Sequence, residues 1–200
     1  MENVFVAATH NKGKLIEMEA IVSKLGIELI TRDDAGVPHD FDVEEDGTTF
    51  EENSYKKAHA IMKLTGLPSM ADDSGLMVDY LNGAPGVYSA RYGGPEESFD
   101  KNNEKLLSEM KDCPEGKRTA HFVTVITLVY PDGKSIVARG ECEGSIATEK
   151  RGTDGFGYDP LFIPKGYLKT FSELGTDFKN SVSHRKLALL ELEKKLKEDR

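Results

Sequence analysis

A polar and basic segment near the amino terminus separates a short apolar run from an amphipathic stretch. The segment is Thr9-His10-Asn11-Lys12-Gly13-Lys14, and the stretch after it has helical spacing. A helix N-terminus has free backbone N–H groups and a partial positive charge, which suit a phosphate group. The threonine and asparagine add polar contacts, the glycine allows close backbone approach, and the two lysines add charge. The segment predicts a phosphate site, although its glycine spacing is not that of a P-loop and an ordinary strand–helix turn is the alternative.

Two adjacent carboxylates form a second candidate site. Asp72 and Asp73 follow the apolar Met70-Ala71 and precede Ser74-Gly75, so we expect them at the end of a strand. Open α/β sheets bind ligands beyond the carboxyl ends of their strands, and carboxylates there suit magnesium. Neighbouring strand side chains point to opposite sides, so we expect only one of the two to enter a given site. A polar turn capped by Asp and Ser is the alternative.

Glu51 and Glu52 stand in the first turn of a predicted helix, capped by Thr48 or Thr49. Carboxylates in a first turn compensate the helix dipole, which is the simpler interpretation. A metal-binding role is compatible with this interpretation, because one glutamate can face solvent while the other faces a metal ion.

Two segments near the carboxyl terminus carry aromatic and basic groups. Gly155-Phe156-Gly157-Tyr158-Asp159-Pro160 can offer a ring for base stacking, or it is a glycine-rich turn whose aromatics cover the core. Ser183-His184-Arg185 begins a predicted helix, with Lys179 four residues before the serine. These side chains can donate to oxo groups or hold a phosphate. A capped helix start with exposed charges is the alternative.

The elements that must position these segments alternate between strand and helix. Strands are predicted at 4–8, 27–31, 69–71, 76–78, 119–129, 135–138, 141–146 and 161–163. The predicted inward positions of the helices are Leu15, Met18, Val22 and Leu25; Phe50, Ser54, Ala58, Ile61 and Met62; Phe99, Leu106 and Met110 (within 95–110); and Leu187, Leu190 and Leu196. Early alternation and a late hairpin predict an α/β fold with a mixed central sheet flanked by helices.

Composition limits the class of protein. A chain of 200 residues, 38% of them hydrophobic, predicts one globular domain over residues 1–200 and excludes disorder. The net charge of −9 excludes a protein that wraps a nucleic acid polymer. Cys113 and Cys142 are too few for a disulfide framework or a zinc cluster. With no signal peptide and no membrane-length apolar run, we expect a cytoplasmic protein without membrane contact.

Six segments, in this order, resemble the inosine triphosphate pyrophosphatase family over nearly the whole chain. They are THNKGK at 9–14, DGTTFEENSYKKA at 46–58, MADDSGL at 70–76, GAPGVYSARY at 83–92, GFGYDPLFIP at 155–164 and SHR at 183–185. The resemblance implies an elongated mixed α/β fold with two lobes, a nucleotide cleft between them, and a homodimer. It also implies Mg2+-dependent hydrolysis of XTP, ITP and dITP to the nucleoside monophosphate and pyrophosphate.

The resemblance assigns roles to individual residues. Asp73 would be the catalytic proton acceptor and a metal ligand, Glu52 a second metal ligand, and Asp72 a supporting residue. The implied substrate contacts are Thr9, His10, Asn11, Lys12, Gly13, Lys14, Ser74, Phe156, Gly157, Tyr158, Asp159, Lys179, His184 and Arg185. His10 departs from the family, which often has a small residue or threonine there.

Two other classes remain as alternatives. A non-catalytic purine nucleotide-binding protein would bind the triphosphate with magnesium and leave it intact. A phosphatase that forms an aspartyl-phosphate needs Asp-x-Asp, whereas the two aspartates here are adjacent. For the enzyme, donors such as Arg185 would donate hydrogen bonds to the 6-oxo group of hypoxanthine or xanthine and disfavour the amino group of adenine.

Overall fold

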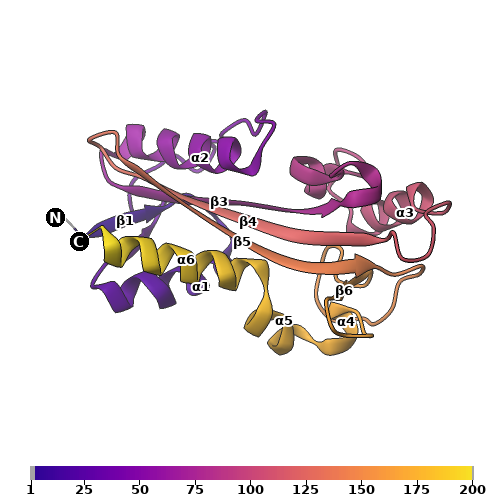
Figure 1. The fold of residues 1–200 in the computed structure, drawn as a ribbon. Coiled ribbons are helices and arrows are strands. Elements are labelled where there is room, and N and C mark those ends of the chain that lie inside the picture. The colour runs from indigo at the N-terminus through magenta and orange to yellow at the C-terminus, as the bar shows by residue number, and fades with distance from the viewer. Residues whose placement is uncertain (1–2, 200) are drawn as a thin grey trace. The chain divides into compact units, whose positions relative to one another are not determined.

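The computed structural model describes residues 3–199. Within this range, one six-stranded sheet has the order β2-β1-β3-β4-β5-β6 (Figure 1). Its strands are β1 Val4–Ala7, β2 Glu28–Thr31, β3 Ser69–Val78, β4 Thr119–Val129, β5 Ser135–Ile146 and β6 Phe162–Pro164. β1 is parallel to β2 and β3, whereas β5 and β6 are antiparallel. The predicted mixed α/β sheet is confirmed.

The helices begin and end at residues of expected type. They are α1 Lys12–Val22, α2 Phe50–Thr65, α3 Phe99–Glu109, α4 Phe171–Leu174, α5 Thr176–Val182 and α6 His184–Glu198, with 3-10 turns at Ser23–Leu25, Asp79–Leu81 and Gly86–Arg91. Thr49 caps α2 by accepting a hydrogen bond from the Glu52 backbone, and Gly66 ends this helix in the left-handed conformation. In the described residues 3–199, no helix combines the length and apolarity needed to cross a bilayer.

The chain divides into two compact units, which are described separately below. Unit 1 comprises Met1–Asp73, Thr124–Gly140 and Leu187–Arg200, and unit 2 comprises Ser74–Val123 and Glu141–Lys186.

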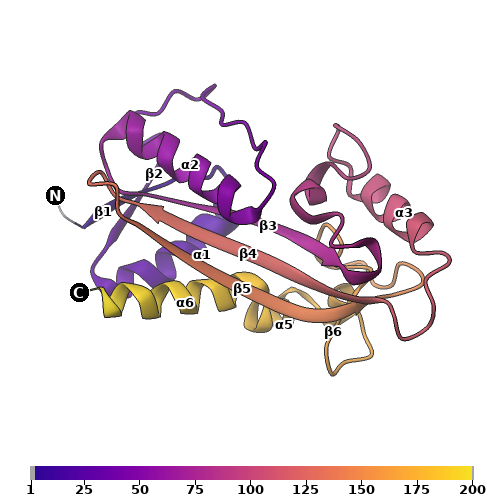
Figure 2. The same cartoon turned by 45° about the horizontal axis from the view of Figure 1, so that its top comes forward.

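Unit 1 buries both faces of its part of the sheet. Figures 1 and 2 show α1 and α6 on one face and α2 on the other. Because strand side chains alternate, consecutive residues enter different cores. Met70 packs in the cluster that includes Met18 of α1 and Leu192 of α6. Its neighbour Ala71 packs in the cluster that includes Ile61 of α2. This alternation sets where the next residues of β3 point.

Unit 2 has an aromatic core. The Phe122 ring centroid lies 4.6 Å from that of Phe162 and 6.2 Å from that of Phe171. Leu106 of α3 and Met110, the residue that follows this helix, pack in the same cluster and are fully buried. The prediction that these two residues face inward is confirmed. It is wrong for Phe99, whose side chain is 53% exposed, because α3 is only beginning at this residue and its buried stripe starts at Asn102.

Two strand breaks predicted from the sequence are wrong. β3 runs without interruption through Asp72–Gly75, and β5 runs through Arg139-Gly140. Aspartate and glycine are typical of turns, but lysine partners, described below, allow both aspartates to remain inside the strand. In β5, alternating buried and exposed residues continue across the glycine.

The buried stripe of α6 also differs from the prediction. Leu196 is buried as expected, but Leu187 and Leu190 are 42% and 44% exposed. The residues that enter the core are Ala188, Leu189, Leu192 and Leu196. Their spacing of one, three and four residues follows one side of a helix, and the other two leucines lie outside it.

Candidate active site

The register of β1 and β3 places the basic segment beside the two aspartates. Val6 pairs with Ser69 and Ala7 with Met70 in parallel, and the Ala8 N–H donates to the Met70 carbonyl at 2.8 Å. The chain therefore leaves β1 alongside the next residues of β3.

The start of α1 is capped by its own side chains. The Asn11 Oδ1 accepts a hydrogen bond from the Lys14 backbone at 3.2 Å, and the Thr9 Oγ1 accepts one from the Asn11 backbone at 3.1 Å. Lys12 and Gly13 are exposed in this first turn. His10 is exposed too, and its ring lies 5.7 Å from the ring of His39. Polar groups and positive charge thus gather at this helix N-terminus.

Asp72 points to the α1 side of the sheet. Its Oδ2 lies 2.8 Å from the Lys14 Nζ, and the residue is only 3% exposed. The pair satisfies a buried carboxylate and fixes a lysine of the basic segment.

Asp73 points to the α2 side, as the alternation of strand side chains requires. Its Oδ1 lies 3.7 Å from the Lys57 Nζ, which in turn is 3.1 Å from the Glu45 Oε1. Burial raises the pKa of the Asp73 carboxyl to about 6, against the opposing effect of the Lys57 charge. The negative charge of Glu45 raises this pKa further. A carboxyl with this pKa is suited to accept a proton near neutral pH.

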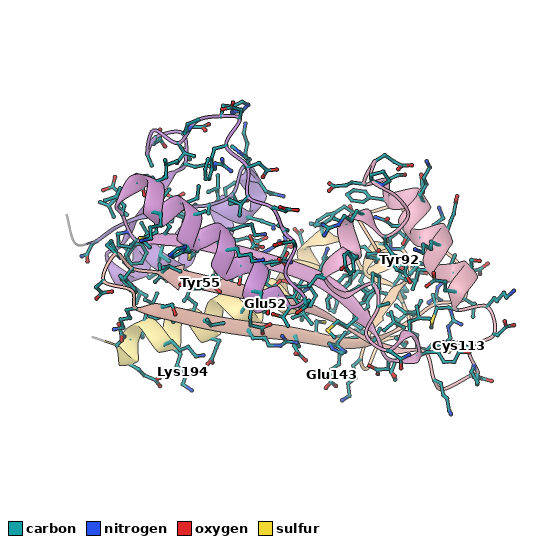
Figure 3. The ribbon with its side chains drawn as sticks, turned by 90° about the horizontal axis from the view of Figure 1, so that it is seen from above. Glu52, Tyr55, Tyr92, Cys113, Glu143 and Lys194 are labelled. Carbon is teal, nitrogen blue, oxygen red and sulfur yellow. The ribbon has the colours of Figure 1, made fainter. Side chains whose placement is uncertain are left out.

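Glu52 has a local structural role. Its Oε2 accepts hydrogen bonds from the Thr48 backbone at 2.6 Å and from the Thr48 hydroxyl at 3.0 Å. These bonds hold the pKa of the Glu52 carboxyl below its usual range. Figure 3 shows Glu52 on α2, near its N-terminal end, with Tyr55 on the same helix. Glu51 pairs with Arg139 at 2.7 Å, so both glutamates have partners in unit 1.

Three residues near Asp73 escaped the sequence analysis: Glu45, Asn53 and Lys57. Asn53 is fully buried, accepts a hydrogen bond from the Gly47 backbone at 2.8 Å and lowers the pKa of Asp73. Asn53 and Lys57 are four residues apart on α2 and therefore share a face. This spacing was visible in the sequence, but which face meets Asp73 depends on the register of β3. Glu45 lies in an irregular acidic segment without any periodic signal.

In unit 2, the aromatic loop 155–159 is organised by Asp159. This carboxylate is 1% exposed, and its Oδ2 accepts hydrogen bonds from the Phe156 backbone at 3.0 Å and from the Lys179 Nζ at 2.7 Å. The Lys179 Nζ also lies 4.1 Å from the centroid of the Phe156 ring, in a cation–π contact. Phe156 is 55% exposed, so its ring is available to a ligand.

The other candidates of unit 2 are more buried. Tyr158 is in the core, and its hydroxyl donates to the Ser89 carbonyl at 2.8 Å. His184 is 6% exposed and stacks on Phe122 at 4.9 Å. Ser74 and Arg185 are half-buried. The structure therefore leaves Phe156 as the most exposed side chain among the aromatic and basic candidates of this unit.

The donor set around Asp73 fits a hard divalent cation. Within residues 3–199, no group of three or more His, Cys, Asp and Glu side chains is arranged to hold a metal ion by itself. The oxygen donors on the α2 side of the strand are the carboxylates of Asp73 and of Glu45, whose charge acts on Asp73. Magnesium uses one or two carboxylates and keeps several waters, so a sparse set of oxygen donors suits it.

Comparison with known proteins confirms the resemblance inferred from the six segments. A model of the Ham1 family matches residues 5–195. The dITP/XTP pyrophosphatase of Clostridium perfringens is 48% identical over 199 residues, covering 96% of this chain and 97% of the relative. That of Geobacter sulfurreducens is 52% identical over 184 residues, covering 92% of each. The HAM1 protein from Coxiella burnetii has a TM-score of 0.90 at 40% identity, covering 98% of each chain.

Proposed function

The chain belongs to the Ham1 family, and we propose that it hydrolyses dITP, ITP and XTP to the nucleoside monophosphate and pyrophosphate. The observation that carries this proposal is the buried Asp73 carboxyl, with a pKa of about 6, on the strand adjacent to the basic segment. The dITP/XTP pyrophosphatases from Clostridium perfringens and Geobacter sulfurreducens support the choice of substrate.

We propose that the N-terminus of α1 binds the triphosphate. The partial charge of the helix N-terminus, Lys12 and Lys14 supply positive charge there, and Gly13 leaves room for a phosphate oxygen. Asp72 holds Lys14 in place through the 2.8 Å ion pair. Binding lowers the repulsion that shields the α phosphorus from a nucleophile.

Asp73 then acts as the general base. Its carboxylate orients a water and accepts a proton from it as the water oxygen attacks the α phosphorus, and pyrophosphate leaves. General-base assistance contributes about 10²–10⁴-fold to a rate. A pKa of about 6 keeps most Asp73 carboxyls ionised at neutral pH while they remain basic enough to accept the proton.

Magnesium is the proposed cofactor, held by Asp73 with a second carboxylate. It would neutralise phosphate charge and stabilise the leaving pyrophosphate. Glu52 is the second ligand expected from the resemblance. Glu45 is the alternative that the contacts favour, because its charge acts on Asp73, whereas the Glu52 carboxylate is bonded to Thr48. Magnesium titrations of Glu45→Gln and Glu52→Gln separate the two, since only loss of the true ligand weakens magnesium binding.

Unit 2 supplies the proposed base contacts. The exposed Phe156 ring is the stacking surface, and Lys179, His184 and Arg185 are donors for a 6-oxo group. An adenine amino group would meet these donors with a donor of its own, and a buried mismatch of this kind is strongly disfavoured.

Three further expectations belong to the same proposal. The chain acts as one catalytic domain, as a homodimer, in the cytoplasm. The family resemblance supports the dimer, and the two free cysteines, Cys113 and Cys142, are compatible with a reducing compartment.

Pyrophosphate release from a panel of nucleoside triphosphates, with and without magnesium, tests the function. We expect release from ITP, dITP and XTP and much slower release from ATP and GTP. Orthophosphate as the product would instead indicate an aspartyl-phosphate phosphatase. Magnesium-dependent binding of ITP without turnover would indicate a non-catalytic nucleotide-binding protein.

A further inference from the structure

Helix α3 contacts the aromatic loop 155–159 through two residues one turn apart. Phe99 and Asn103 are separated by four positions, so they lie on the same side of this helix. The Phe99 ring centroid is 6.3 Å from that of Phe156, and the Asn103 Nδ2 donates to the Gly157 carbonyl at 2.9 Å. Both contacts fall within unit 2.

The loop needs such external support. Phe156 stands between Gly155 and Gly157, whose φ angles are +82° and +63°. Glycines add conformational freedom on both sides of the ring. Asp159 fixes the backbone N–H of Phe156, and Asn103 fixes the carbonyl of the next residue. The backbone around Phe156 is therefore held from two directions.

Asn103 has features that stability alone does not explain. It is 2% exposed, yet its buried Oδ1 accepts no hydrogen bond from residues 3–199. A buried polar atom without a partner costs free energy, and an apolar side chain of similar shape avoids that cost. Gly157 is half-buried, so water can reach this residue if the amide is removed. The presence of asparagine is thus better explained by its hydrogen bond to the Gly157 carbonyl than by its contribution to folding.

Phe99 supplies a second exposed ring next to the first. It is 53% exposed, and its plane is tilted by 39° from that of Phe156. Large apolar side chains at this exposure gain little from burial, but together the rings form a local aromatic surface. The Lys179 ammonium lies 4.1 Å from the centroid of the Phe156 ring, so a positive charge adjoins this aromatic surface.

We propose that Asn103 and Phe99 are positioning residues for the purine base, which act by holding the loop and ring of Phe156 in one orientation. This inference rests on the proposed function and extends it to a helix that none of the six family segments includes. Substitution of either residue should therefore weaken binding of the base and leave binding of the triphosphate unchanged.

A double-mutant cycle tests the proposal. Pyrophosphate release from ITP is measured for Asn103→Leu, Phe99→Ala, Phe156→Ala and the two doubles that combine Phe156→Ala with each. Base stacking is worth about 1–3 kcal/mol, so we expect Phe156→Ala to raise KM about 5–150-fold. Asn103→Leu and Phe99→Ala should each raise KM about 3–10-fold with kcat nearly unchanged. About 1 kcal/mol of binding free energy is lost when the Phe156 ring is no longer held in one orientation. In the Phe156→Ala background, each should change KM less than about twofold.

Matched controls separate positioning from folding. Glu104→Gln changes an exposed neighbour on α3 and should leave KM unchanged. Inorganic triphosphate, used as a competitive inhibitor without a base, should bind all variants equally. Urea denaturation should give Asn103→Leu a stability equal to or above that of the wild type.

Three results would overturn the proposal. They are additive effects of Asn103→Leu and Phe156→Ala on KM, weaker binding of inorganic triphosphate in the α3 variants, and a loss of stability that accounts for the loss of activity. Absence of pyrophosphate release from ITP by the wild type would refute the proposed function and this inference together. The three earlier results refute the inference alone.

Discussion

Asp73→Asn should make the protein more stable at pH 8 while abolishing most of its turnover. The Asp73 carboxyl is buried, and burial raises its pKa from 3.8 to about 6. Between these two values, the folded state binds more protons than the unfolded chain does. Stability therefore falls as pH rises through this window, and the loss is complete above about pH 6.

The magnitude follows from the shift. Each pKa unit corresponds to about 1.4 kcal/mol, so the charged Asp73 costs about 3 kcal/mol of stability at pH 8. The same linkage gives about 1.5 kcal/mol at pH 5, where the folded carboxyl is mostly protonated. Asparagine removes the charge and keeps a similar shape. Lys57 retains its partner Glu45, at 3.1 Å, so no buried cation is left unpaired.

Urea denaturation without magnesium, at pH 5 and pH 8, measures this effect. We expect Asp73→Asn to raise the free energy of unfolding by about 3 kcal/mol at pH 8 and by about half as much at pH 5. Asp72→Asn is the matched control, because it breaks the 2.8 Å pair with Lys14. It should lower stability by about 1–3 kcal/mol, the cost of leaving a buried polar group without its partner.

Two outcomes would refute this reasoning. One is a loss of stability in Asp73→Asn at pH 8. The other is an equal gain at both pH values, which would show that the charge of Asp73 carries no desolvation cost.

Four further variants test other parts of the site. Lys57→Met should raise the pKa of Asp73 and move the acid limb of the kcat/KM profile to higher pH, whereas Glu45→Gln should lower this pKa and move the limb to lower pH. Shifts in the same direction would show that Lys57 and Glu45 do not act on Asp73 with opposite charge. Asp159→Asn should lower the free energy of unfolding, measured in urea, by about 3–5 kcal/mol, because Lys179 is then buried without its partner. A loss below about 1 kcal/mol would show that Lys179 does not depend on this ion pair. Gly155→Ala should lower the free energy of unfolding by more than about 1 kcal/mol, because the residue has φ +82° and the added Cβ would collide with the Asp159 carboxylate. Unchanged stability would show that the loop relaxes freely.

The sequence predicted the sheet and most helices because their signals are local. Apolar spacing and caps such as Thr49 and Gly66 depend on neighbouring residues only. The strand break predicted at Asp72 was wrong because of contacts distant in sequence, whereas at Gly140 the alternating burial of β5 simply continues. A turn-forming residue remains in a strand when distant partners satisfy it, as Lys14 and Lys57 do for the two aspartates. Tertiary contacts of this kind leave no local signal.

Only part of the candidate site was predicted, because its tertiary contacts also leave no local signal. The alternation of Asp72 and Asp73 followed from strand geometry, and the structure places their partners on different helices. Glu45, Asn53 and Asn103 were missed because each acts on a segment that is distant in sequence, and Glu45 lies in a segment without periodic signal. Glu52 shows the converse, since one spacing fits both a metal ligand and a helix cap.

Hydrolysis of ITP in water labelled with oxygen-18 tests the central claim most directly. If Asp73 directs water to the α phosphorus, mass spectrometry will find one labelled oxygen in the inosine monophosphate and none in the pyrophosphate. Label in pyrophosphate, or release of labelled orthophosphate, would place the attack at another phosphorus and contradict the account.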